Sequence, residues 1–310
     1  MKTPNLFIVG QPKSGTTALH SFLEQHPDIF MSNPKEPAYF SKDFHKESDR
    51  FHDKKLYFSF RDKNSYLKLF SSVKKEKVVG ESSTNYLYSK VAAKEIHSFN
   101  PNAKIIMMLR EPVALMYSLY NQYLNETQEN VGSFQEALSL EDSRKKGENI
   151  PSRIRSPSYL FYSERVKYLE QIRRYFDLFD KDKIKILIFE EFKLNNEETY
   201  KDVLKFLGVK DFEPEFKEVH FSKKPRSSFF NNVLRNPFLT KPFKVVLPMN
   251  FYVKIRDFFH NILMKKELNI PIDKELEKQL KFSYKKDILK LSKYLKEDLI
   301  KIWGYDKIEK

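Results

Sequence analysis

A glycine-flanked loop is the part of this sequence whose residue types and spacing are best suited to chemistry. Residues 10–19 read GQPKSGTTAL and follow the apolar run Leu6–Val9. A strand, a tight turn and a helix N-terminus in this order direct free backbone N–H groups and the positive end of the helix at one point. Lys13 adds a cation, so the loop predicts a site for a phosphate or sulfate group. Hydroxyl donors would come from Ser14, Thr16 and Thr17.

The position of the lysine separates this loop from that of the nucleoside triphosphatases. Those loops place a lysine directly after the second glycine, followed by a Ser or Thr that binds magnesium. Here Thr16 follows Gly15, and Lys13 comes two residues before that glycine. This order favours a single sulfonate or phosphate over a magnesium-bridged triphosphate. The alternative is an ordinary turn with a solvated lysine, and the flanking strand and helix patterns argue against it.

A second anion site is predicted around Arg110. This arginine follows the apolar run Lys104–Leu109, at the end of a predicted strand, where open α/β sheets bind ligands. Its planar guanidinium suits a phosphate. Ser118 comes eight residues later, about two helical turns, so both side chains could reach one anion. Alone, Arg110 would be interpreted as a capping or ion-pairing residue; beside the first loop, the binding role is favoured.

With both motifs in view, Pro12–Thr17 resembles the 5′-phosphosulfate loop of sulfotransferases that use 3′-phosphoadenosine 5′-phosphosulfate (PAPS). The heparan sulfate sulfotransferase-like, glycan-modifying branch and its bacterial relatives are the most similar. The resemblance implies transfer of a sulfuryl group from PAPS to a hydroxyl or amine of a glycan, lipid or small-molecule acceptor. It also implies release of 3′-phosphoadenosine 5′-phosphate (PAP), with no metal required.

The same resemblance assigns the donor contacts. Arg110 and Ser118 would hold the 3′-phosphate, and the late basic loop Lys223–Arg226 would close on it through Lys224 and Arg226. Lys13 would also contact the oxygen that bridges phosphate and sulfur, which makes it a catalytic candidate. The 5′-phosphosulfate would be held by Lys13, Ser14, Gly15, Thr16, Thr17 and Ala18.

Further similarity runs through most of the chain, with one departure. Glycan-type enzymes often carry a lysine directly after the glutamate that ends the second predicted strand, whereas this chain has Ser82 after Glu81. Either Lys13 alone stabilises the charge on the leaving group, or a lysine later in the chain takes the role of the missing one. The supporting segments resemble the family's later helices, last strand and C-terminal end: Tyr162–Leu169, Phe189–Phe192, Phe206–Gly208 and Leu299–Trp303.

Glu36 is the candidate general base. The segment Lys35–Phe40 resembles the one that carries the catalytic glutamate of glycan sulfotransferases. We expect Pro37 to restrict Glu36 to an extended backbone that returns over the phosphate loop. Another branch of the family uses a histidine after the second strand, and Gly80–Tyr88 contains none. Glu81 is the competing candidate for the general base, and we expect it to have a structural role instead. For Glu36, the alternative is a surface Lys–Glu pair without a catalytic role.

The positive charge is concentrated late in the chain. The net charge is +14, and Lys217–Lys266 holds eleven Lys and Arg against Glu218 and Asp257, so 11 − 2 = +9 lies there. Such a segment predicts an anionic partner. Residues 251–262 carry a helical apolar face, which predicts a core-packed helix with a solvated basic side, or a lid that meets an acidic glycan or a membrane lipid. We interpret 217–266 as a subregion for acceptor or lid, and not as a separate domain.

The rest of the chain predicts the elements that position these residues. Short apolar runs predict strands buried on both faces at Leu6–Val9, Lys77–Val79, Lys104–Leu109 and Lys183–Phe189. Helical patterns separate them, which predicts a parallel sheet. We expect an α/β fold: one P-loop-type sulfotransferase domain over residues 1–310, with a central parallel β-sheet flanked by helices on both faces.

Two helical patterns are clear enough to define a buried face. Asn196 is the expected N-cap of the first helix and Gly208 its stop. Its face consists of Tyr200, Val203, Leu204 and Leu207. The second pattern predicts one amphipathic helix near the end of the chain, through Ile288, Leu291, Leu295, Leu299 and Ile302.

Composition narrows the class of protein. Apolar residues make up 40% and aromatic residues 15%, as in a globular protein. There is no cysteine, the seven histidines are scattered, and no metal-binding spacing is found. Without a signal peptide or an apolar span of about 20 residues, we expect a cytoplasmic protein with at most peripheral membrane contact. The alternatives are a P-loop nucleotide kinase and a non-enzymatic anion- or membrane-binding module, and no nucleic-acid motif is found.

Overall fold

The computed structural model describes residues 3–216, 223–225, 264–266 and 272–308 of the chain. The chain divides into two units. The first consists of Met1–Glu218 together with Ile272–Lys310, and the second is Val219–Pro271. The first unit contains a five-stranded sheet. In the second unit, strand β6 (Lys223–Pro225) pairs antiparallel with β7 (Met264–Lys266).

The five-stranded sheet is parallel throughout and has the order β2-β3-β1-β4-β5. The α/β fold with a central parallel sheet is confirmed, and the four predicted strands correspond to β1, β3, β4 and β5. Strand β2 was not predicted, because three residues are too short to show a periodic pattern. The strands are β1 (Leu6–Gly10), β2 (Ile29–Met31), β3 (Val78–Ser82), β4 (Lys104–Leu109) and β5 (Ile184–Ile188).

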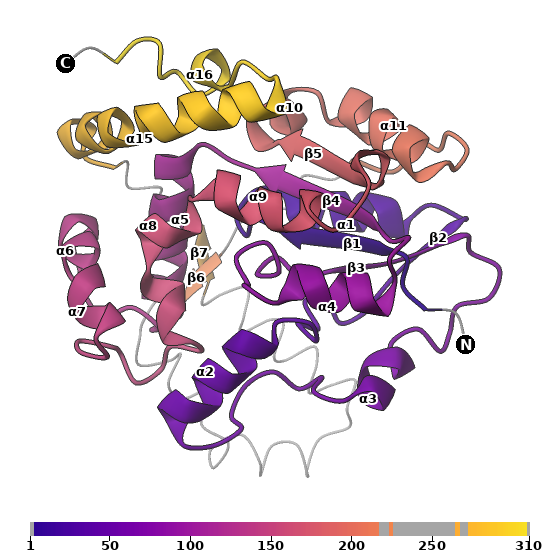
Figure 1. Ribbon diagram of the computed structural model, residues 1–310, viewed down its shortest axis with the longest axis horizontal. Coiled ribbons are helices and arrows are strands. Elements are labelled where there is room, and N and C mark those ends of the chain that lie inside the picture. Colours follow the sequence, from indigo (N-terminus) through magenta and orange to yellow (C-terminus); the bar gives the residue numbers. More distant parts are fainter. Residues whose placement is uncertain (1–2, 217–222, 226–263, 267–271, 309–310) are drawn as a thin grey trace. The chain divides into compact units, whose positions relative to one another are not determined.

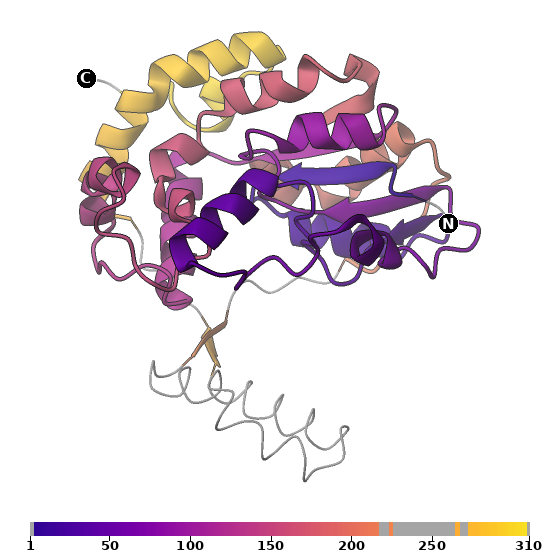
Figure 2. The ribbon, with the colours of Figure 1, turned by 60° about the horizontal axis from the view of Figure 1, so that its bottom comes forward.

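Apolar side chains cover both faces of the sheet, which explains why its strands read as continuous apolar runs. On one face, Leu6 and Ile8 of β1 pack with α1 (Thr16–Glu24) and α11 (Asn196–Leu207). On the other face, Phe7 and Val9 pack in a larger core that includes α4 (Ala92–Phe99), α5 (Pro112–Asn125) and α9 (Tyr168–Phe176). Figures 1 and 2 show the sheet between these layers of helices.

The remaining helices of the first unit lie around this core (Figure 1). Two of them, α15 (Lys274–Leu295) and α16 (Leu299–Ile302), come from the C-terminal part of the chain and contribute Ile288, Leu291 and Leu299 to the larger core. The others are α2 (Lys42–His52), α3 (Lys63–Lys68), α6 (Phe134–Ser139), α7 (Glu141–Lys145), α8 (Tyr162–Arg165) and α10 (Phe189–Leu194). Short 3₁₀ turns are η1 (Pro157–Leu160) and η2 (Lys181–Lys183).

The first predicted helical face is buried, and the second packs against the core with Leu295 and Ile302 half-buried. Two helix boundaries differ from the prediction. The N-cap of α11 is Asn195, so Asn196 is already helical, whereas Gly208 ends the helix in the left-handed conformation as expected. The pattern predicted as one C-terminal helix is divided into two, because Lys296 adopts φ 59° and closes α15. The apolar spacing runs across this break, so periodicity alone did not reveal it.

The order of the strands predicts a ligand crevice between β1 and β4. The chain passes from β3 on one side of β1 to β4 on the other side. At such a point, the loops after the two central strands diverge and leave a crevice at the carboxyl ends of the strands. The loop after β1 and the arginine after β4 are the two predicted anion sites.

Candidate functional site

The loop after β1 presents unpaired backbone donors. Gly15 is the N-cap of α1 with φ 82° and ψ 3°, and no side chain caps this helix. Within the described part of the chain, the backbone N–H groups from Ser14 to Ala18 donate to no backbone carbonyl. The first turn of α1 also contains no acidic residue. Unpaired donors at the positive end of a helix form an anion site.

Glycine is required at both ends of this loop. A Cβ at Gly15 would lie 3.1 Å from a ring carbon of Phe192 and 3.2 Å from one of Phe189, both in α10. A Cβ at Gly10, where φ is 149°, would lie 2.6 Å from the carbonyl oxygen of Thr84. The two glycines therefore let the loop approach α10 on one side and the chain after β3 on the other.

Arg110 connects the two predicted anion motifs. Its Nη1 donates a hydrogen bond of 2.8 Å to the carbonyl oxygen of Lys13, and its guanidinium lies 4.9 Å from the ring centre of Phe189. The hydroxyl of Tyr168 donates to the carbonyl oxygen of Arg110 at 2.8 Å. Burial lowers the pKa of Arg110, and the nearby Glu190 opposes this shift. Arginine still stays protonated at neutral pH, so a fixed cation lies at the edge of the phosphate loop.

Most of the other predicted donor contacts lie in the loop after β1 or on α5. Lys13 is half-buried with φ 63°, and Ser118 is half-buried on α5, the helix that begins directly after Arg110. Lys224 lies on β6 of the second unit, and Arg226 lies outside the described residues. In the loop itself, Ser14 and Thr16 are buried, Ala18 is half-buried and Thr17 is exposed.

Glu36 lies at the carboxyl end of β3, the strand beside β1. Its backbone N–H donates to the carbonyl oxygen of Ser82 at 2.9 Å. The prediction of an extended backbone is wrong: Glu36 has φ 61°, because this turn brings its chain back against the end of β3. The Glu36 side chain is 42% exposed and forms an ion pair with Lys35 at 3.2 Å. The carboxylate therefore stays accessible to an acceptor, although the surface Lys–Glu pair considered as the alternative is also present.

Glu81, the competing carboxylate, points into the core. It is fully buried and accepts hydrogen bonds from Tyr66, Tyr86 and Ser83, at 3.0, 2.8 and 2.6 Å. Burial raises its pKa to about 7, and the three hydroxyl donors oppose this shift. A carboxyl enclosed in this way cannot reach an acceptor, which supports the structural role expected for it.

Ser82, which stands where glycan-type enzymes often have a lysine, has a specific partner. The Nδ1 of His20 on α1 lies 2.8 Å from the Ser82 hydroxyl oxygen. Burial and then the charge of Lys35 lower the pKa of His20 to about 4, so the imidazole is neutral near pH 7. This buried neutral pair includes the residue at the position of the missing lysine, and nothing in the sequence beyond the departure at Ser82 indicates it.

The C-terminal segment supports Arg110 through two glutamates that the sequence did not single out. Glu111 caps α5 by accepting from the N–H groups of residues 113 and 114, and it also accepts from Tyr305 at 2.6 Å. Glu190 accepts from the backbone N–H of Glu111 at 3.1 Å and from Trp303 at 2.8 Å. The predicted C-terminal similarity through Trp303 thus has a structural reason: it fixes the chain next to Arg110.

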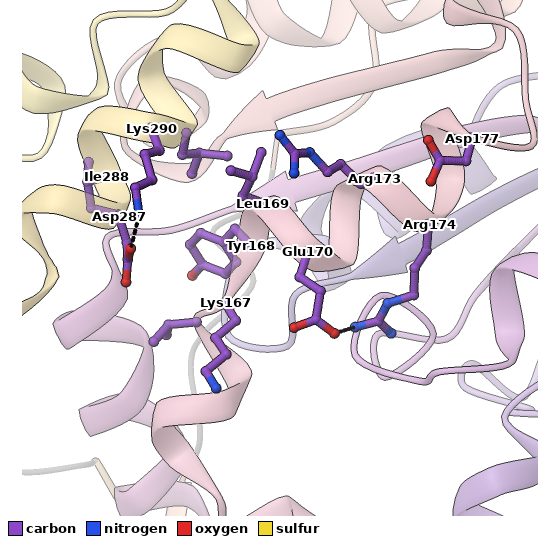
Figure 3. Close-up of a pocket in the computed structure, with 12 residues that line it drawn as sticks. Lys167, Tyr168, Leu169, Glu170, Arg173, Arg174, Asp177, Asp287, Ile288 and Lys290 are labelled. Carbon is purple, nitrogen blue, oxygen red and sulfur yellow. Dashed lines mark hydrogen bonds and ion pairs between the residues drawn. The ribbon is translucent and has the colours of Figure 1, made fainter.

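A pocket of about 580 Å³ lies between α9 and α15 and shares Tyr168 with the surroundings of Arg110. Figure 3 shows two ion pairs among its charged side chains, Glu170 with Arg174 at 3.2 Å and Asp287 with Lys290 at 3.6 Å. None of the predicted site residues lines it. We therefore place the candidate site at the crevice.

The described part of the chain contains neither a membrane-spanning helix nor a candidate metal cluster. None of the helices in that part of the chain is long and apolar enough to cross a membrane. Nor do the side chains there form a cluster of three or more His, Cys, Asp or Glu residues with the geometry of a metal site.

The sequence belongs to a known family. Residues 4–214, more than half of the chain, match the Sulfotransferase family. The protein is therefore a member of the sulfotransferase family, and the predicted resemblance is confirmed.

Individual relatives agree with this assignment. Human Carbohydrate sulfotransferase 15 is 27% identical over 280 residues, which cover 73% of this chain and 47% of that protein. Human Bifunctional heparan sulfate N-deacetylase/N-sulfotransferase 3 is 28% identical over 221 residues, covering 67% of this chain and 22% of that protein. This chain thus spans half or less of the length of these relatives. The crystal structure of a sulfotransferase from Alicyclobacillus acidocaldarius aligns with a TM-score of 0.71 at 25% identity, over 97% of this chain and 99% of that one.

Proposed function

We propose that this protein transfers a sulfuryl group from PAPS to a hydroxyl or amine group of a glycan. The hydrogen bond from Arg110 to the carbonyl oxygen of Lys13 carries this proposal. It brings two separate anion-binding motifs together at the crevice, as a nucleotide with phosphates at both its 5′ and 3′ positions requires. The relatives named for carbohydrate and heparan sulfate support the glycan as acceptor.

The residues at the crevice fit PAPS. The unpaired N–H groups from Ser14 to Ala18 form a cradle that a Cβ at Gly15 would disturb. These groups, with the hydroxyls of Ser14, Thr16 and Thr17, would hold the 5′-phosphosulfate. Arg110 and Ser118 would hold the 3′-phosphate, and Lys224 and Arg226 are proposed to add to it.

PAPS, when bound, supplies an activated sulfuryl group on a phosphate leaving group. The ammonium of Lys13 would stabilise the negative charge that grows on the leaving oxygen, as cations do in phosphoryl transfer. The carboxylate of Glu36 would accept the proton of the acceptor hydroxyl. The loop and Arg110 would fix the donor so that donor and acceptor stay aligned. None of these roles needs a metal ion.

Family membership favours this function over the two alternatives from the sequence, a nucleotide kinase and a non-enzymatic anion-binding module. The interpretation of residues 1–310 as one sulfotransferase domain, with 217–266 as an acceptor or lid subregion, remains part of the proposal. So does a location in the cytoplasm with at most peripheral membrane contact.

A panel of acceptors tests the acceptor class. The protein is incubated with ³⁵S-labelled PAPS and, in separate reactions, with heparosan, unsulfated chondroitin, galactosylceramide and 4-nitrophenol. We expect label on one or both polysaccharides, at a rate that falls at least tenfold with the Lys13→Ala variant. Label only on the glycolipid or the phenol would show that the acceptor class is wrong while the sulfotransferase activity stands.

A further inference from the structure

Lys35 lies at the same edge of the sheet as the phosphate loop. It follows β2 closely, and because all strands of the sheet are parallel, the chain after β2 and the loop after β1 leave the sheet at one edge. The Nζ of Lys35 lies 3.2 Å from Oε1 of Glu36, the candidate base. The N–H of Glu36 is in turn bonded to the carbonyl oxygen of Ser82 at the end of β3. An ammonium bonded to the base lies close to the group that the base deprotonates.

The side chain of Lys35 is largely covered. It is only 20% exposed, although it belongs to a turn, and the neighbouring Glu36 is 42% exposed. Its charge acts on His20 of α1, since this charge is the second cause, after burial, that lowers the pKa of His20. Nδ1 of His20 lies 2.8 Å from the hydroxyl oxygen of Ser82. The charge of Lys35 is therefore felt at the position where glycan-type enzymes often carry a lysine.

This charge also lies near the place proposed for the sulfuryl group. His20 comes about one helical turn after Thr16, the first residue of α1. The N-terminus of α1 is the cradle proposed for the 5′-phosphosulfate. Lys35 therefore lies between this cradle and Glu36, the two groups that would hold the donor and activate the acceptor.

Sulfuryl transfer requires positive charge at more than one place. The bond between sulfur and the bridging oxygen breaks, and its electron pair leaves with the phosphate of PAP, where Lys13 would act. A bond forms between the acceptor atom and sulfur, and the proton of the acceptor goes to Glu36. The transferred group carries negative charge on its outer oxygens throughout, as a phosphoryl group does.

We propose that Lys35 is a second catalytic cation, which binds an outer oxygen of the sulfuryl group and replaces the lysine that is absent at Ser82. The inference rests on the proposed function, with Glu36 as the base. The replacement comes earlier in the chain than Ser82, and not later as considered from the sequence. Residues from two neighbouring strands can supply the same charge because both strands end at the same edge of the sheet.

The ion pair with Glu36 is compatible with this role. An ammonium has three N–H donors on a flexible stem, so Lys35 can bond Glu36 and a sulfuryl oxygen at the same time. Once Glu36 has accepted the proton, its carboxyl is neutral and attracts the ammonium less. More of the charge of Lys35 then acts on the sulfuryl oxygens.

The competing explanation is an ordinary surface ion pair, which contributes little. Lys183 provides the matched control, because it also pairs with its neighbour in sequence, Asp182, at 3.4 Å and is 30% exposed. Lys35→Ala should lower kcat with labelled PAPS by about 10²-fold, whereas Lys183→Ala should leave kcat unchanged. Both variants should bind PAP as the wild type does, because PAP lacks the sulfuryl group.

Two further measurements separate a catalytic cation from a structural lysine. Ethylammonium chloride should raise the turnover of Lys35→Ala, and sodium chloride at the same ionic strength should not. Lys35→Arg keeps a cation and should retain more turnover than Lys35→Ala.

An NMR titration of His20 tests the placement of Lys35 without any turnover. Because the charge of Lys35 lowers the pKa of His20, Lys35→Ala should raise this pKa, and Lys183→Ala should leave it unchanged. Normal turnover of Lys35→Ala, no rescue by ethylammonium, or an unshifted pKa of His20 would overturn the inference. A wild type that labels no acceptor, or a Glu36→Gln variant with normal turnover, would instead contradict the proposed function.

Discussion

Replacing Glu36 by glutamine should lower turnover by about 10²–10⁴-fold while PAP binding stays nearly unchanged. The substitution keeps the size of the side chain and removes the group that would accept the acceptor's proton. The positive φ at Glu36 supports this role, because left-handed non-glycine residues are costly and concentrate at functional sites. Turnover is measured with labelled PAPS and the best acceptor of the panel, and PAP affinity by calorimetry.

Glu81→Gln is the matched control for this experiment. Glu81 is enclosed by three hydroxyl donors, so its replacement should change stability more than turnover per folded molecule. Near-normal turnover of Glu36→Gln, next to a folded but inactive Glu81→Gln, would transfer the role of the base to Glu81.

Replacing Arg110 by alanine should weaken PAP binding by about 10²-fold. A charge-assisted hydrogen bond contributes about 1.5–3 kcal/mol, and the guanidinium would make more than one to a phosphate. The variant also loses the bond that holds the carbonyl oxygen of Lys13. Calorimetry with PAP measures the change in affinity.

Lys13→Ala is the comparison that separates the two roles. Its charge would act mainly as the leaving oxygen becomes negative, so kcat should fall more than PAP affinity. Equal losses of affinity and of kcat in the two variants would mean that the roles assigned to Lys13 and Arg110 are wrong.

The sequence was sufficient to predict four of the five strands of the sheet and to indicate the two candidate anion motifs. Strands such as Lys104–Leu109 are buried on both faces and therefore read as uninterrupted apolar runs. Gly10 and Gly15 mark the loop because both adopt a positive φ, which glycine accommodates most readily. Properties of this kind depend on local residue types, so they are visible before the chain is folded.

What the sequence could not reveal depends on contacts between distant segments. His20 and Ser82 are 62 residues apart, and their pairing becomes apparent only once α1 lies against the end of β3. The same holds for Lys35, whose charge reaches His20 only once the turn after β2 lies against the end of β3. The left-handed turn at Glu36 was missed because Pro37 favours an extended residue before it and the tertiary bond to Ser82 prevails.

Calorimetric titration of the wild type with PAP and with adenosine 5′-phosphate tests the central claim most directly. The two nucleotides differ only in the 3′-phosphate, the group assigned to Arg110 and Ser118. We expect PAP to bind at least tenfold more tightly, with no need for magnesium, because the 3′-phosphate adds charge-assisted hydrogen bonds. Equal affinities for the two nucleotides, or tighter binding of magnesium–ATP than of PAP, would contradict a site built for PAPS.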